Sequence, residues 1–300
     1  MGETLSLLSA FFWACAVIIF KNIGDKVSPI MINAIKNTIG VFLIFITIYL
    51  LDMNSINIPT KIDFNDIMIL LISGTIGLGI ADILFLKSLN ILGASLTALI
   101  DIVYSPFVLF FAFILLGEKL LIIQIFGGFL ILFSIIFASY KHQNINLSRL
   151  NFLKGVLIGI SALAMMAVCI VLIKPILNKT ETISSQLWVA GFRMIPGSIT
   201  PIILSLIYIK PKKIIKILKN IEILKPICLG AFFATYLGIS FWIIGMANTK
   251  ASIAAILNQT ASFFILILAR IFLKEIITMR KLIAIIIASF GSILIIIGNK

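Results

Sequence analysis

The sequence is short of charge. Only 12% of its residues are Asp, Glu, Lys or Arg, whereas 61% are hydrophobic and the mean hydropathy is +1.23. A soluble domain carries about 25% charged residues, and a chain with far fewer has too little polar surface to face water. The composition therefore excludes a soluble protein and predicts an integral membrane protein.

Histidine and cysteine are also scarce. His142 is the single histidine, and Cys15, Cys169 and Cys228 lie in apolar runs without a CxxC spacing. Histidine and closely spaced cysteines supply most metal ligands and redox centres. The sequence thus predicts no metal site, no disulfide framework and no other cofactor.

Motifs of catalysis and of ATP use are missing as well. The chain has no HExxH, no DDxxD, no GxSxG turn with a plausible base and no GxxxxGK[ST] loop. These motifs mark metalloproteases, metal-dependent transferases, hydrolases and phosphate-binding loops. Their absence argues against an enzyme, with a membrane-embedded transferase as the weakest alternative, and against transport driven by ATP.

Long apolar runs are what the chain has in abundance. Each is long enough to cross about 30 Å of hydrocarbon at about 1.5 Å per residue. They lie at residues 5–20, 30–51, 65–86, 94–115, 120–140, 152–173, 184–209, 226–246, 252–272 and 282–298. The first run lacks a basic flank and a cleavage site, so it is predicted to be retained. We therefore predict an all-α protein with ten transmembrane helices.

The chain also repeats itself. Residues 94–118 return 157 positions later as residues 251–275, with ten of 25 positions identical. The same offset pairs Lys36 with Arg193 and Asp101 with Asn258. Five helices per half is an odd number, so the second half would enter the bilayer from the opposite side. This predicts two inverted five-helix repeats, residues 1–143 and 144–300, with a site at their interface.

The remaining basic residues are unevenly distributed. Without Lys36, Arg193 and Arg270, which lie inside apolar runs, fifteen of 21 Lys and Arg fall on one side of the predicted membrane. The positive-inside rule makes that side cytoplasmic and places both termini outside the cell membrane. Residues 210–226, KPKKIIKILKNIEILKP, resemble an amphipathic segment held against anionic lipid. The basic pI of 9.8 then needs no nucleic-acid partner.

Four features together resemble the drug/metabolite transporter superfamily, specifically its ten-helix EamA-type permeases. They are the five-plus-five arrangement, the Trp-containing run FFWACAVIIFK, the cations of AIKNTIG and GFRMIPG, and the segment from ASLTAL to LLGEKL. The resemblance implies an inverted repeat around a central cavity and transport of amino acids and other small metabolites, often outward.

Two features depart from that family. Its members keep both termini in the cytoplasm and have a basic loop after the second helix, whereas here that loop is acidic, with Asp52, Asp63 and Asp66. Short relatives also exchange protons through a carboxylate in the first helix, and neither the first nor the sixth run has one. The proton mechanism of those relatives therefore does not carry over.

Buried polar side chains are the candidate site. An ionisable group in hydrocarbon is costly unless it faces protein, water or a partner, so each one suggests function. The predicted substrate-binding residues are Lys36, Asp82, Asp101, Tyr104, Arg193, Trp242, Asn258 and Gln259. The weaker candidates are Asn33, Asn37, Gln186, Trp188 and Tyr236. Snorkelling of the cations to an interface and a static ion pair with Asp82 or Asp101 stay open as structural alternatives.

Outside these runs, Glu118 and Glu275 recur at tight connections and are predicted to cap helices. Pro106, Pro196 and Pro201 are predicted to interrupt the fourth and seventh runs. The leading interpretation is a secondary transporter, a monomer or weak dimer in membrane lipid, that moves small metabolites by alternating access and exports them. Proton exchange, solute exchange and facilitated diffusion all remain open. A lipid-linked sugar flippase of the same superfamily is the main alternative.

Overall fold

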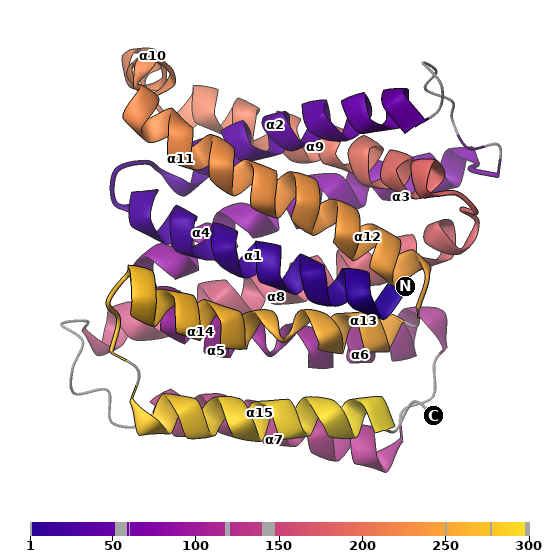
Figure 1. Ribbon diagram of the computed structural model, residues 1–300, viewed down its shortest axis with the longest axis vertical. Coiled ribbons are helices and arrows are strands. Elements are labelled where there is room, and N and C mark those ends of the chain that lie inside the picture. Colours follow the sequence, from indigo (N-terminus) through magenta and orange to yellow (C-terminus); the bar gives the residue numbers. More distant parts are fainter. Residues whose placement is uncertain are drawn as a thin grey trace.

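The computed structural model describes residues 2–51, 59, 61–117, 121–139, 148–249, 251–276 and 278–297. Within these residues every regular element is a helix. Figure 1 shows the helices as long rods stacked side by side, with most connections at the two ends of the stack. The first residues of α1 (Gly2–Gly24) and the last of α15 (Met279–Ile297) lie at the same end, opposite α10 (Pro211–Lys219) (Figure 1).

The described residues before residue 144 form a succession of helices. After α1 come α2 (Pro29–Leu51), α3 (Phe64–Ser73), the π-helix η1 (Gly74–Ala81), α4 (Asp82–Leu92), α5 (Ala94–Asp101), α6 (Tyr104–Leu116) and α7 (Ile122–Ser139). Those of the second half, besides α10 and α15, are α8 (Arg149–Asn178), α9 (Ile183–Tyr208), α11 (Ile221–Ala231), the π-helix η2 (Phe232–Gly238), α12 (Ile239–Ala247), α13 (Ala251–Asn258) and α14 (Ala261–Phe272).

Among the described residues, seven helical stretches are long and apolar enough to cross a membrane. They are Gly2–Gly24, Pro29–Leu51, Phe64–Leu92, Ala94–Leu116, Arg149–Asn178, Ile183–Tyr208 and Ile221–Ala247. The three other predicted runs contain α7, α13, α14 and α15, where the described residues form only shorter apolar stretches such as Ala261–Phe272 and Leu282–Gly291. The expectation of a multi-pass, all-α membrane protein is confirmed, whereas the number ten stays a prediction.

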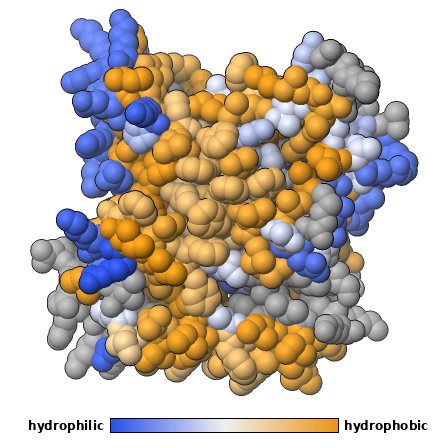
Figure 2. Space-filling view, viewed as in Figure 1, coloured by the Kyte–Doolittle hydropathy of each residue, from blue (hydrophilic) through white to orange (hydrophobic). Residues whose placement is uncertain are grey.

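The outer surface is apolar over the middle of the stack. Figure 2 shows hydrophobic residues across the central band and hydrophilic residues gathered towards the two sides at which the helices end. Large apolar side chains such as Phe42, Leu50, Phe129 and Leu206 are exposed. A lipid bilayer is the solvent that such a band requires.

Glycines let two elements of different halves approach at the centre of the fold. A Cβ at Gly74 of η1 would lie 2.0 Å from the carbonyl oxygen of Arg193 in α9, and one at Gly197 would lie 2.7 Å from Cβ of Leu78. No side chain fits at either distance. Small residues therefore bring η1 and α9 into backbone contact, as expected where lipid provides no hydrophobic drive between helices.

Prolines do not end the helix that contains them. The prediction of an interruption at Pro196 and Pro201 is wrong, because α9 runs as one helix from Ile183 to Tyr208. In the fourth run the interruption falls at residues 102–103, before Pro106. Neighbouring helices can satisfy the backbone groups that an intramembrane proline frees, so the helix can continue through it.

Polar side chains form hydrogen bonds with backbone groups at helix ends in both halves. Lys21 donates to the carbonyl oxygen of Asn90 at 3.1 Å, and Lys174 donates to that of Met246 at 2.6 Å, so each lysine caps the end of a helix. Glu275 accepts from the backbone N–H groups of Ala94 and Ser95 at 2.8 and 2.9 Å. Glu275 is thus a helix cap as predicted, but of α5 in the other half. Glu118 lies outside the described residues.

Candidate functional site

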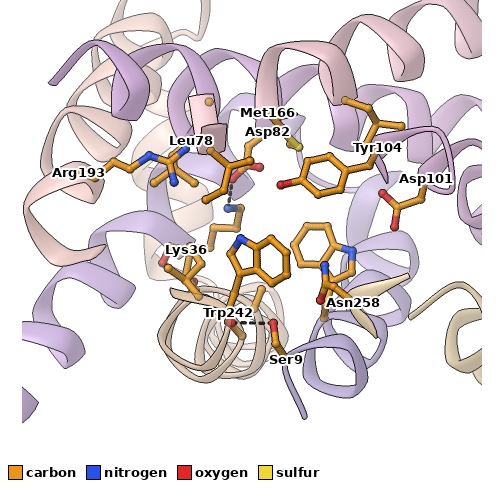
Figure 3. Close-up of a pocket in the computed structure, with 18 of the residues that line it drawn as sticks. Ser9, Lys36, Leu78, Asp82, Asp101, Tyr104, Met166, Arg193, Trp242 and Asn258 are labelled. Atoms are coloured by element: carbon orange, nitrogen blue, oxygen red, sulfur yellow. Dashed lines mark hydrogen bonds and ion pairs between the residues drawn. The ribbon is translucent and has the colours of Figure 1, made fainter. Parts of the chain in front are cut away.

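A cavity lies between helices of both halves (Figure 3). Its volume is about 130 Å³, whereas one water molecule needs roughly 10–15 Å³ of such space. A small solute therefore fits. The lining residues are Ser9, Trp13, Lys36, Gly77, Leu78, Asp82, Asp101, Tyr104, Leu163, Met166, Ile170, Arg193, Ala234, Thr235, Gly238, Ile239, Trp242, Asn258 and Gln259. The structure thus brings all eight predicted site residues to one cavity, and their binding of substrate remains a prediction.

One of the two cations is neutralised. Lys36 Nζ of α2 lies 2.5 Å from Asp82 Oδ2 of α4, and both side chains are buried. Lys36 also donates to Oδ1 of Asn37 at 2.8 Å. This is the ion pair that the sequence left open as an alternative, and it excludes snorkelling of Lys36 to an interface.

The other cation has no such partner. Arg193 of α9 is 5% exposed, and its Nε has no hydrogen-bond partner. Its guanidinium forms neither an ion pair nor a hydrogen bond with any residue that the structure describes. Burial of an unpaired ion costs several kcal/mol of folding free energy. No ion pair or hydrogen bond with a described residue offsets this cost for Arg193.

The repeat explains why the two cations differ. Position 193 is equivalent to position 36, and the position equivalent to Asp82 is Ile239, which also lines the cavity. The first half thus has a carboxylate at the position that pairs with Lys36, and the second half has the uncharged Ile239 at the equivalent position. Arg193 therefore lacks an ionic partner among the described residues because of one residue difference between the repeats, aspartate at position 82 and isoleucine at position 239.

The acceptor groups that have no partner among the described residues lie away from Arg193. Figure 3 shows Arg193 on one side of the view and both Asp101 and Asn258 on the other, with Lys36 and Asp82 drawn between them. The carboxylate of Asp101 has no hydrogen-bond or ion-pair partner among the described residues, and Oδ1 of Asn258 is buried without one. The cavity therefore has a donor side and an acceptor side, both unsatisfied.

Helix breaks position the acceptor side. Helix α5 ends at Asp101 and α6 begins at Tyr104, while α13 ends at the equivalent residue Asn258 and α14 begins at Ala261. Gln259 Nε2 donates to the carbonyl oxygen of Ile102 at 2.9 Å, so a side chain of the second half satisfies backbone that the break in the first half frees. Irregular backbone at membrane depth is tolerated where protein or a cavity surrounds it.

Two π-helices border the cavity from equivalent places. Residues 74–81 form η1 and residues 232–238 form η2, and the offset of 157 relates them within one residue. The side-chain amides of Asn33 and Asn37 donate to the carbonyl oxygen of Leu78 in η1 at 2.9 and 3.0 Å. Thr235 of η2 donates to the carbonyl oxygen of Lys36 at 2.9 Å. Short π-helical stretches are rare and occur often at functional sites.

Aromatic side chains form part of the wall. Tyr104 and Trp242 lie with ring centroids 6.3 Å apart, and Trp13 packs on Phe85 at 5.3 Å. Phe85 and Trp242 occupy equivalent positions of the repeat. Apolar walls with a few polar groups are typical of small-molecule sites.

The weaker candidates lie outside the cavity lining. Asn33 and Asn37 bind backbone oxygens, Gln186 accepts from Asn248 at 3.2 Å, and Trp188 is buried against Phe192. The hydroxyl group of Tyr236 contacts that of Thr47 at 2.8 Å. These five residues stabilise helix contacts, which was the structural alternative for several of them.

Sequence reasoning did not single out Ser9, Trp13, Thr235 or Met166 as lining residues. Trp13 and Met166 are equivalent at the shorter offset of 153 that relates the first helices of the two halves. That offset could have identified them. Ser9 and Thr235 carry no comparable signal, since hydroxyl side chains are common in transmembrane helices. Within the described residues no group of three or more His, Cys, Asp or Glu could hold a metal.

Comparison with known proteins agrees with this architecture. The model of the EamA-like transporter family matches residues 1–140 and again residues 153–297. An uncharacterized transporter of Methanothermobacter thermautotrophicus is 28% identical over 131 residues, which span 44% of this chain and 37% of that protein. A solved crystal structure of a protein 15% identical in sequence has the same fold, with a TM-score of 0.70 over 98% of this chain and 95% of the other.

Proposed function

Because the chain belongs to the EamA-like transporter family, we propose that it is a secondary transporter for a small zwitterionic metabolite such as an amino acid. It works without chemical change to the solute, as the family and the related transporter indicate. The observation that carries the substrate class is the buried, unpaired guanidinium of Arg193. A substrate carboxylate is the group that would satisfy it, because guanidinium and carboxylate form paired hydrogen bonds.

The acceptor side completes the recognition of a zwitterion. Asp101 and Asn258 offer oxygen atoms that no described residue occupies, and a protonated amino group has donors for both. The Lys36–Asp82 pair adds no net charge to the cavity. A solute with one negative and one positive group therefore matches the two sides, whereas a simple anion would leave Asp101 unsatisfied.

Alternating access is proposed from the symmetry of the cavity wall. Equivalent positions of both halves line it, including 36 and 193, 82 and 239, and 101 and 258. This supports two inverted five-helix units, residues 1–143 and 144–300, that rock about a common site, with ten membrane crossings in total. The π-helices η1 and η2 and the breaks after Asp101 and Asn258 are the irregular segments at which such movement would be absorbed.

Export across the cell membrane is proposed from the resemblance to the family. A secondary mechanism agrees with the lack of a phosphate-binding loop for ATP. Transport is proposed to be driven by exchange, either of one solute for another or of the solute for protons. In the second case Asp101 would carry the proton, since its carboxylate has no ionic partner among the described residues.

Binding and counterflow with purified protein test the proposal. One amino acid, its amide, and the same acid without its amino group are compared by thermal shift, and the amino acid is followed into proteoliposomes. We expect binding that needs both charged groups and saturable counterflow of the intact amino acid. Arg193→Gln is expected to lower affinity by about 10- to 150-fold, the loss of a charged hydrogen bond of about 1.5–3 kcal/mol.

The matched control is Arg270→Gln, which makes the same change at an exposed guanidinium outside the cavity. It should leave binding and counterflow at the native level. Equal binding of the amino acid and its amide, or an Arg193→Gln variant that transports like the native protein, would contradict the proposed site. Chemical conversion of the solute would contradict a transporter.

A further inference from the structure

Helix α10 lies where two membrane spans end. The span of α9 ends at Tyr208 and the next begins at Ile221, and α10 occupies residues 211–219 between them. Both neighbouring spans end at the boundary between hydrocarbon and water, so α10 lies at this boundary. In Figure 1 it stands at the end of the stack, away from both chain ends.

The lysines of α10 lack partners in the protein. Lys212, Lys213, Lys216 and Lys219 are exposed, and none forms an ion pair or hydrogen bond with a described residue. Figure 2 shows hydrophilic residues gathered at the corner of the molecule that α10 occupies. At 100° per residue these lysines share one face of the helix.

The other face of α10 is apolar and only partly covered. Ile217 is 4% exposed and Ile214 packs against the core, so one edge is docked on the protein. Ile215 and Leu218 are about half exposed, and Tyr208 and Ile221, which flank α10 along the chain, are more than two-thirds exposed. An uncovered apolar edge thus runs from the neighbouring spans onto α10, next to its lysines.

From these contacts we infer that α10 binds the anionic headgroups of membrane phospholipids, with Ile215 and Leu218 against the acyl chains. The occupant must offer negative charge and hydrocarbon side by side, because the lysines and the apolar edge adjoin each other. A nucleic acid or a free phosphate has the charge without the hydrocarbon. The inference is independent of the transported substrate.

Lipid titration of the full-length protein in detergent tests the inference. Phosphatidylglycerol and phosphatidylcholine are added, and bound lipids are counted by native mass spectrometry at several salt concentrations. We expect preferential binding of phosphatidylglycerol that weakens as salt rises. Replacing Lys212, Lys213, Lys216 and Lys219 by Gln is expected to lower that affinity by about tenfold or more. Replacing the four by Arg should preserve it.

The matched control changes four exposed lysines elsewhere, Lys26, Lys87, Lys154 and Lys274, to Gln, with the same loss of net charge. It should keep most of the phosphatidylglycerol affinity. I215S/L218S should weaken binding while leaving its salt dependence intact. The inference is overturned if the α10 variant binds phosphatidylglycerol like the native protein, if the control loses as much, or if glycerol phosphate displaces the lipid at equal concentration.

Discussion

Lys36 and Arg193 occupy equivalent positions 157 residues apart, yet only Lys36 has a carboxylate within hydrogen-bond distance, that of Asp82 at 2.5 Å. Both cations are buried beside one cavity. The difference follows from Ile239, which stands where a second aspartate would complete the symmetry. One cation is therefore neutralised by an acid of its own half, and the other has no ionic partner among the described residues.

The Lys36–Asp82 pair should behave as a unit. Lys36→Ala or Asp82→Ala alone leaves a buried charge unpaired, and each is expected to lower the free energy of unfolding by about 3–5 kcal/mol. Lys36→Met combined with Asp82→Leu should recover most of this loss, since the pair is replaced by apolar groups. Thermal unfolding of the three variants in detergent measures the coupling. Single variants as stable as the native protein would contradict the pairing.

Ile239→Asp should abolish the proposed binding of a substrate carboxylate by Arg193. The new carboxylate stands at the position equivalent to Asp82, so it would pair with Arg193 as Asp82 pairs with Lys36. We expect loss of carboxylate-dependent binding by thermal shift, with the protein still folded. Ile239→Asn introduces a polar group of the same size without charge and should retain more binding. Equal effects of Asp and Asn would show that size, not charge, is responsible.

Gly74→Ala should push η1 away from α9. Its Cβ would lie 2.0 Å from the carbonyl oxygen of Arg193, a backbone atom that cannot turn aside. We expect destabilisation of about 1–3 kcal/mol or more, as for other overpacked sites, and reduced transport. Gly128→Ala in α7 is the control, because nothing lies within 4 Å of its Cβ. Fluorescence-detected thermal unfolding should separate the two variants clearly.

The ion pairs at the start of α3 should respond to pH. Lys179 Nζ lies 2.5 Å from Asp66 Oδ2 and 3.7 Å from Asp63 Oδ2. The backbone N–H of Asp66, and then Lys179, hold the pKa of Asp63 below its ordinary value of 3.8. Hydrogen bonding to Asp66 raises the pKa of Lys179 above 10.5. A lowered acid pKa stabilises above 3.8 and a raised lysine pKa stabilises below 10.5.

Protection of the first turn of α3 against hydrogen exchange should therefore be highest between these two values. It should fall when acid protonates Asp63 through its lowered pKa, and again when base deprotonates Lys179. Lys179→Gln should remove the alkaline change. Protection that is constant across the whole range would mean that the bridge contributes nothing to the docking of α3.

Reporter fusions should reveal the orientation. The end that carries α10 is predicted from the sequence to hold most of the Lys and Arg that lie outside the apolar runs, and it is expected to face the cytoplasm. The first residues of α1 and the last of α15 lie at the opposite end of the stack (Figure 1). A C-terminal alkaline phosphatase should then be active, and a C-terminal green fluorescent protein should stay dark. The reverse pattern would assign the family's usual orientation to this chain.

The sequence predicted the helices and the residues that line the cavity for a simple reason. Hydropathy marks the membrane spans directly, and a buried ionisable residue such as Lys36 or Asp82 stands out against an apolar run. Repeat equivalence then joined Lys36 to Arg193. Which acid would pair with which cation was beyond the sequence, because Asp82 and Asp101 are both deep and only packing brings Asp82 to Lys36.

The irregular segments could not be predicted in the same way. Gly74, Gly77 and Gly79 make η1 glycine-rich, but η2 forms around Gly238 alone, so composition carries no common signal for a π-helix. The break after Asn258 has no proline near it, unlike the one before Pro106. At the break after Asp101, a side chain of the opposite half, Gln259, satisfies the freed backbone of Ile102, and such a contact cannot be read from local sequence.

The exchange of Asp82 for Ile239 between the halves makes them non-interchangeable. A chimera built from two first halves would carry two self-balanced pairs and nothing to attract an anion. One built from two second halves would bury two bare guanidinium groups and would have difficulty folding. Under the proposed function, the loss of one acid from one copy of a duplicated unit leaves a buried cation to which a substrate carboxylate can bind.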